Sequence, residues 1–69
     1  MKLSARNVLT GTTKEITPGA VDTEVVIELS SGVEIVSIIT KKSAESLRLA
    51  VGDKASAIIK APNVMIGVE

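Results

Sequence analysis

The stretch Ala20-Val21-Asp22-Thr23-Glu24-Val25-Val26-Ile27-Glu28-Leu29 gives the clearest secondary-structure signal in this chain. Its side chains alternate, which predicts a half-buried β-strand. One face carries Val21, Thr23, Val25, Ile27 and Leu29, and the other carries Asp22, Glu24, Val26 and Glu28. Thr17-Pro18-Gly19 before this strand and Ser30-Ser31-Gly32 after it are turn sequences. We therefore expect an antiparallel neighbour on each side.

The rest of the chain predicts four more strands and one short helix. The expected elements are strands over Leu3–Ile16, Val33–Thr40, Lys54–Ala61 and Asn63–Val68, and a helical turn over Lys41–Leu47 capped by Thr40 or Ser43. Gly11 indicates a bulge or bend in the first strand. Five strands with a helix between the third and fourth is the element order of an oligonucleotide-binding barrel. We therefore expect an all-β, five-stranded Greek-key barrel of this kind.

The size and composition of the chain predict self-association. A chain of 69 residues buries a small fraction of its surface, and it has no Cys or His with which to add disulfides or a structural zinc site. The third expected strand also carries Val36 and Ile38 on the face opposite to Ile35. Water is a poor neighbour for a strand that is apolar on both faces. We expect a partner subunit to cover this strand.

Composition also argues against several classes of function. Eight basic and eight acidic residues leave no net charge, and the chain has no aromatic side chain, so nucleic-acid binding is not expected. Asp22, Glu24 and Glu28 are best interpreted as a solvated strand face, because no His, Cys or metal-ligand cluster accompanies them. No apolar run is long enough to span a membrane. A cytoplasmic, non-catalytic protein is the expectation.

Three groups of hydrogen-bond donors could bind an anion. They are Ser4 with Arg6 in the opening strand, Thr40 with Ser43 at the helix start, and Lys60-Ala61 at the end of the fourth strand. Arginine offers a fork of fixed donors and lysine a mobile charge, whereas acid-base catalysis needs groups that this chain hardly supplies. Charge and spacing alone favour an ordinary interpretation, with solvated cations, a plain helix cap and a strand-end hydroxyl.

Four short motifs change this weighting. Ser4-Ala5-Arg6-Asn7, Gly19-Ala20-Val21, Ser37-Ile38-Ile39-Thr40 and Ile59-Lys60-Ala61-Pro62 resemble the molbindin, or Mop, family in content and order. The resemblance covers nearly the whole chain and implies one oxyanion-binding domain over residues 1–69. It further implies a homohexamer, built as a trimer of dimers, which holds molybdate or tungstate between subunits and needs no other cofactor and no metal ion.

The resemblance also implies the ligand-binding residues. They are Ser4, Arg6, Thr40, Ser43, Lys60 and Ala61. Ala61 is a departure, because some relatives carry a serine after the lysine, and here only the backbone N–H can donate. The implied function is storage or buffering of the oxyanion for molybdenum homeostasis. The alternative is a non-catalytic assembly or regulatory module with degenerate anion sites, which the missing hydroxyl at Ala61 favours.

Overall fold

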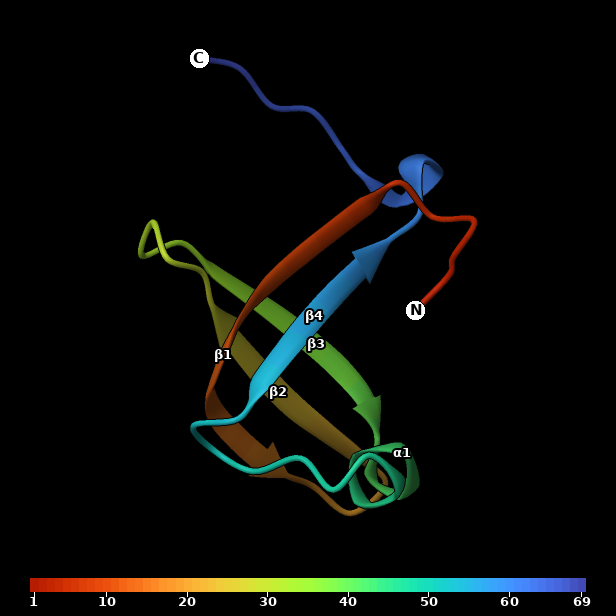
Figure 1. The fold of residues 1–69 in the computed structure, drawn as a ribbon, viewed down its shortest axis with the longest axis vertical. Helices are drawn as coiled ribbons and strands as arrows, with labels where there is room; N and C mark the ends of the chain where they lie inside the picture. The colour runs from red at the N-terminus through yellow and green to blue at the C-terminus, as the bar shows by residue number, and fades with distance from the viewer.

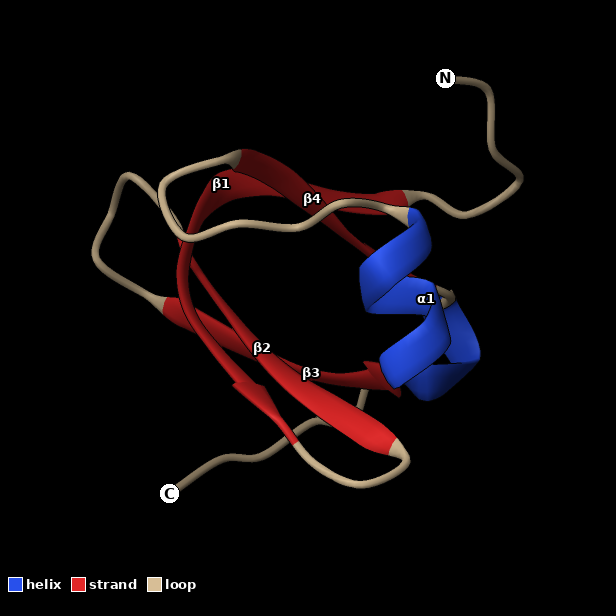
Figure 2. Ribbon diagram, turned by 90° about the horizontal axis from the view of Figure 1, so that it is seen from below, coloured by secondary structure: helices blue, strands red, loops and turns tan.

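A single curled antiparallel sheet carries the fold. In chain order the computed structural model, which describes residues 1–69, contains strands β1 (Asn7–Pro18), β2 (Asp22–Glu28) and β3 (Glu34–Thr40), helix α1 (Lys41–Ser46), strand β4 (Lys54–Ile59) and the short 3₁₀ helix η1 (Ala61–Asn63) (Figure 1). The spatial order β3-β2-β1-β4 is that of a Greek key. Figure 2 shows the sheet bending over on itself, with α1 across one end.

The alternating stretch forms β2, and the inner face predicted for it is confirmed within the strand, whereas Val21, just before it, is 72% exposed. Thr23, Val25 and Ile27 are buried, and Val25 lies between Ile16 of β1 and Ser37 of β3. Val26, on the other face, is also buried. The neighbours on both sides are antiparallel, as the flanking turn sequences predict. Strand β2 therefore supplies most of the small core.

The predicted fifth strand is wrong, and the sheet has four strands. After β4 the chain turns through η1, and the segment Val64–Glu69 has no regular structure and is exposed throughout. Figure 1 shows this segment leading away from the sheet. A strand needs a neighbouring edge to pair with, and the turn at Pro62 carries the segment away from both edges of its own sheet. The all-β, oligonucleotide-binding-like class and the position of the helix are confirmed.

The first strand begins later than its sequence predicts, and its irregularity lies elsewhere. Strand β1 starts at Asn7, because β4 ends at Ile59, the residue opposite it. The bulge falls between Thr13 and Glu15 and not at Gly11. Gly11 serves a different purpose: a Cβ there would overlap the Glu28 carbonyl oxygen and lie 2.9 Å from its carbon. The absence of a side chain lets β1 cross close to the end of β2.

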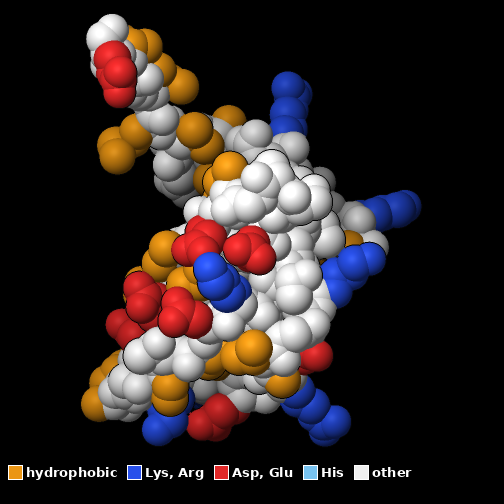
Figure 3. Space-filling model, turned by 90° about the vertical axis from the view of Figure 1, so that its left-hand side faces the viewer, with side chains coloured by type: hydrophobic (Ala, Val, Ile, Leu, Met, Phe, Trp, Pro, Cys, Tyr) orange, Lys and Arg blue, Asp and Glu red, His pale blue; other side chains and the backbone are white.

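The bulge releases Lys14 to join three strands on the outer face. Its Nζ pairs with Glu34 of β3 and lies 3.6 Å from Glu28 of β2. The hydrogen bond and charge of Glu34, followed by the charge of Glu28, raise the pKa of Lys14 above its ordinary value. Figure 3 shows acidic side chains gathered around one basic side chain on this face, with hydrophobic side chains exposed beside them.

A single copy of the chain leaves much apolar surface in water. Only 5 of its 69 residues are buried, which is few for a fold that must be stable in isolation. Val36 and Ile38 are 59% and 61% exposed on the outer face of β3, so the prediction of a third strand that is apolar on both faces is confirmed. An apolar cleft of about 750 Å³ also opens between edge strands β3 and β4. No helix in the chain is long and apolar enough to cross a membrane.

Replacing Gly11 by Ala is expected to destabilise the fold by about 2–3 kcal/mol, because the added methyl group must displace the backbone of β2. Gly67→Ala is the matched control, since a Cβ at Gly67 meets no atom within 4 Å. Urea unfolding at one fixed protein concentration measures both changes. Equal midpoints for the two variants would contradict the close approach.

Replacing Thr13 by Val is expected to stabilise the fold by about 1 kcal/mol. Thr13 is 1% exposed, and its hydroxyl has no hydrogen-bond partner in the chain. An unpaired buried hydroxyl costs free energy that a methyl group of the same shape does not. Thr12→Val, on the exposed neighbour in the same strand, is the control for strand propensity. Thermal unfolding that shows Thr13→Val below the parent would refute this account.

Candidate functional site

The pairing of β1 with β4 brings two of the three donor groups to one end of the sheet. Asn7 is opposite Ile59 in the ladder, so Arg6 and Lys60 follow directly at the same end. The Asn7 side chain adds a hydrogen bond from Nδ2 to the Ile59 carbonyl oxygen at 3.2 Å. Ser4 and Arg6 lie in bends before β1, which corrects their expected place in the strand. The N-terminal bend and the end of β4 thus lie side by side.

This end of the molecule carries free donors and little negative charge. Ser4, Arg6, Lys60 and Ala61 are all exposed, and the Ala61 N–H donates no hydrogen bond within the chain. No Asp or Glu occurs before Glu15, and none occurs between Lys54 and residue 68. The chain is neutral as a whole, but its segments are not. An anion approaching this end meets cations and unpaired donors.

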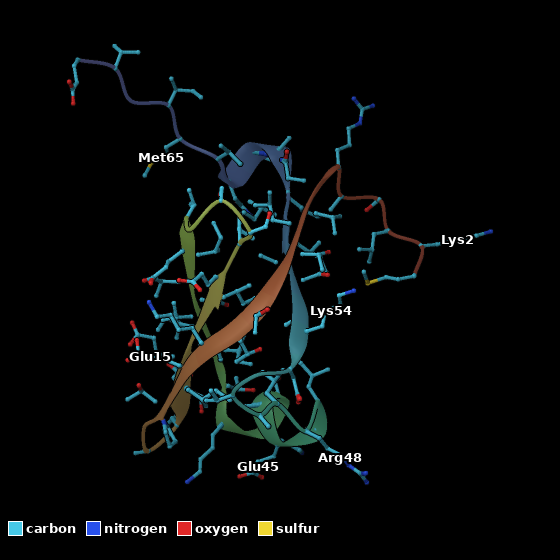
Figure 4. All side chains as sticks on the ribbon, turned by 60° about the vertical axis from the view of Figure 1, so that its left-hand side comes forward. Lys2, Glu15, Glu45, Arg48, Lys54 and Met65 are labelled. Carbon is cyan, nitrogen blue, oxygen red and sulfur yellow. The ribbon has the colours of Figure 1, made fainter.

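The third donor group lies at the opposite end. Thr40 pairs with Asp22 at the far end of β2, where α1 begins, and Figure 1 shows α1 at the other end of the molecule from η1. In Figure 4 the labelled Glu45 and Arg48 lie at the end of the molecule opposite to Met65, which follows η1. A single chain therefore does not bring its three donor groups together.

The Thr40 hydroxyl closes the start of the helix. Its Oγ1 accepts a hydrogen bond from the Ser43 N–H at 3.0 Å, as a helix cap does, and donates to Ser43 Oγ at 2.7 Å. Of the two predicted cap residues, Thr40 is the one used. The Ser43 hydroxyl keeps its own proton for another acceptor. A shallow hollow beside it is lined by Thr40, Lys42, Ser43, Ser46 and Leu47.

The predicted set of binding residues leaves out three polar residues near these groups. Lys42 and Ser46 line the hollow with Ser43, because they share one side of α1. Asn7 ties the two segments at the other end together. A signal for Asn7 was present, since this amide directly follows Arg6 in one of the family-like motifs. No group of three or more His, Cys, Asp and Glu side chains that could hold a metal ion forms in the structure.

A curled Greek-key sheet with one helix after its third strand, and exposed cationic donors at one end, defines a small binding module of the oligonucleotide-binding type. The chain belongs to the TOBE domain family, whose model matches residues 3–66, and the resemblance to molbindins is confirmed by its relatives. It is 44% identical to a probable molybdenum-pterin-binding protein of Haemophilus influenzae over the full length of both. It is 45% identical to the molybdenum transport protein ModE of Azotobacter vinelandii, of which it spans 26%.

Solved structures agree with this assignment. The fold matches MopII from Clostridium pasteurianum with a TM-score of 0.92 at 39% identity, over 97% of this chain and 100% of the other. It matches a molybdate-binding protein from Sporomusa ovata with a TM-score of 0.92 at 40% identity, over 99% and 100%. The cytoplasmic molybdate-binding protein ModG, solved with molybdate bound, has a TM-score of 0.96 at 52% identity, and the chain spans 49% of it.

Proposed function

We propose that this chain binds molybdate or tungstate in the cytoplasm, as one oxyanion-binding domain over residues 1–69, and stores or buffers the anion for molybdenum homeostasis. The observation that carries the proposal is the meeting of the Arg6 and Lys60 segments, neither of which carries a carboxylate near these cations. Relatives that are named for molybdate or molybdenum-pterin binding support it. The protein makes and breaks no covalent bond in this role.

The donors at this end suit a tetrahedral dianion. Arg6 supplies a planar fork, Lys60 a mobile charge, and Ser4 and the Ala61 N–H two neutral donors. A set of donors spaced for a large oxyanion prefers molybdate or tungstate to sulfate. The smaller ion cannot reach every donor, and each one left unpaired costs roughly 1–3 kcal/mol.

The same proposal places the complete site between subunits. The donors of one chain are divided between opposite ends of the molecule. When two copies lie side by side and antiparallel, the end with Arg6 and Lys60 meets the end with Thr40 and Ser43 of the other copy, twice per pair. Because the Thr40 hydroxyl is engaged at the helix cap, Ser43 is the one of these two residues that brings a free hydroxyl proton.

Exposed apolar surface supports assembly beyond one chain, with a homohexamer built as a trimer of dimers as the proposed state. The outer face of β3 and the segment Val64–Glu69 both present hydrophobic side chains to water, and Met65 is 93% exposed. Figure 4 shows Met65 projecting from this segment, away from the sheet. Burial of these surfaces between copies would supply the core that one chain lacks.

A second function is a non-catalytic assembly or regulatory module whose anion sites are degenerate. Two observations favour it: Ala61 offers only its N–H, and the Thr40 hydroxyl is already used within its own chain. Native mass spectrometry with and without molybdate separates the two functions, because it counts subunits and bound anions together. A storage protein gains anions in this experiment, and a degenerate module does not.

Val36→Asp is expected to break the oligomer, because it would bury an unpaired carboxylate at the outer face of β3, at a cost of several kcal/mol. Ser31→Asp is the control, since it places the same charge at an exposed position in the turn before β3. Light scattering at micromolar concentration reports the subunit count. A folded monomeric parent, or an intact Val36→Asp oligomer, would contradict the assembly.

Arg6 and Lys60 are expected to act on one bound dianion. Each change to Ala should weaken molybdate binding by about 1.5–3 kcal/mol, the range for hydrogen bonds to charged groups, and the double variant should lose less than the sum. Lys54→Ala, which removes the cation at the other end of β4, should stay within about 0.5 kcal/mol.

Calorimetry on the parent, the two single variants and the double variant measures this double-mutant cycle, and Lys54→Ala is measured beside them. Circular dichroism and subunit count are checked for each protein. A parallel titration with sulfate tests the preference for the larger oxyanion. Parent-like affinity in both single variants, with the oligomer intact, would show that the anion binds elsewhere.

A further inference from the structure

Asn7 occupies the last position at which β1 and β4 hold each other. It is the first residue of β1, and Ile59, its partner in the ladder, is the last residue of β4. Two side-chain hydrogen bonds join these strands: Thr10 to Ser56 at 2.8 Å within the ladder, and Asn7 Nδ2 to the Ile59 carbonyl at 3.2 Å at its end. Beyond Asn7 the two segments leave the sheet.

The two segments that leave the sheet here carry like charges. Arg6 directly precedes Asn7, and Lys60 directly follows Ile59. Two cations at one end of a molecule repel each other, and no carboxylate in either segment compensates them. Without an anion, this repulsion favours separation of the N-terminal bend from the end of β4. The Asn7 side chain opposes that separation, because its hydrogen bond joins the residue after Arg6 to the residue before Lys60.

We propose that Asn7 is a positioning residue, whose amide holds the Ser4–Arg6 bend against Lys60 and Ala61 so that their donors are arranged before the oxyanion arrives. This inference rests on the proposed function. Donors arranged in advance raise affinity, because the ordering cost is met during folding and not during binding. An amide suits this role, because its N–H₂ donates to a carbonyl and it adds no negative charge beside an anion. Aspartate fails on both counts.

The test compares two cross-strand hydrogen bonds of the same strand pair. Asn7→Leu removes the bond beside the site, and Thr10→Val removes the bond within the ladder. Molybdate calorimetry should show Asn7→Leu about three- to tenfold weaker than the parent, the equivalent of one net hydrogen bond. Thr10→Val should stay within about twofold at a similar loss of unfolding free energy. Asn7→Gln keeps the amide donor and should recover part of the affinity.

Hydrogen exchange on the anion-free protein gives a readout that general destabilisation does not move. The amide of Ile59, which pairs with Asn7 at the end of the ladder, should exchange faster in Asn7→Leu, and the amide of Ala57, which pairs with Leu9 inside the ladder, should not. Asn7→Asp serves as a second variant if Asn7→Leu does not fold, and it should bind more than about tenfold weaker, because it loses the donor and adds a charge.

The outcomes separate this inference from the function on which it rests. If the parent protein binds no molybdate, the proposed function fails. If the parent binds and the Asn7 variants bind equally well, the function stands and the positioning role is overturned. Equal affinity losses in Asn7→Leu and Thr10→Val also overturn it, because they show a general effect of the β1–β4 pairing.

Discussion

The antiparallel pairing of β1 with β4 is the constraint on which the rest of this molecule depends. Strand β1 is shared: its second half pairs with β2, and its first half pairs with β4. The bare backbone at Gly11 lets β1 pass close to Glu28 at the end of β2, where its pairing changes from one neighbour to the other. The bulge after Thr13 sharpens the bend. Because β1 begins opposite the end of β4, segments far apart in sequence meet at one end of the sheet.

The small buried core of a single chain bears on both its stability and its proposed function. With five residues buried and 14 large hydrophobic side chains exposed, the isolated fold has little apolar area with which to offset the entropy of ordering its chain. Exposed apolar side chains lie on both edge strands of the sheet and along Val64–Glu69. The donor groups are likewise divided between the two ends. The proposed assembly of copies would therefore complete both the anion site and the apolar core.

Local patterns predicted the elements whose physics is local. Alternation over β2, the turn at Gly32 with its positive φ, and the cap at Thr40 each depend on a few neighbouring residues. The apolar run Val64–Val68 was wrongly assigned to a strand of this chain, because apolar content shows that a segment needs covering and does not show which chain covers it. Gly11 was assigned to the correct strand with the wrong reason, since the close neighbour is Glu28 of another strand.

The candidate site was also predictable only in part. Residue types identified donors suited to an anion, but the proximity of Arg6 and Lys60 follows from the register of β1 on β4. Resemblance to a family, and not periodicity, linked these two residues in advance. Which donors are already engaged is also invisible in sequence, since Thr40 and Ser43 look alike, yet one closes a helix cap and the other keeps a free proton.

Anion binding and assembly should reinforce each other in such a design. Exposed cations at Arg6 and Lys60 bring positive charge to any contact made by that end of the molecule, and a dianion seated there replaces repulsion by attraction. A ligand that contacts two chains binds only the assembled state, so it stabilises the oligomer by mass action. The same linkage requires that assembly raise the affinity for the anion. A short chain with a small core can thus gain both its stability and its selectivity from the contact between copies.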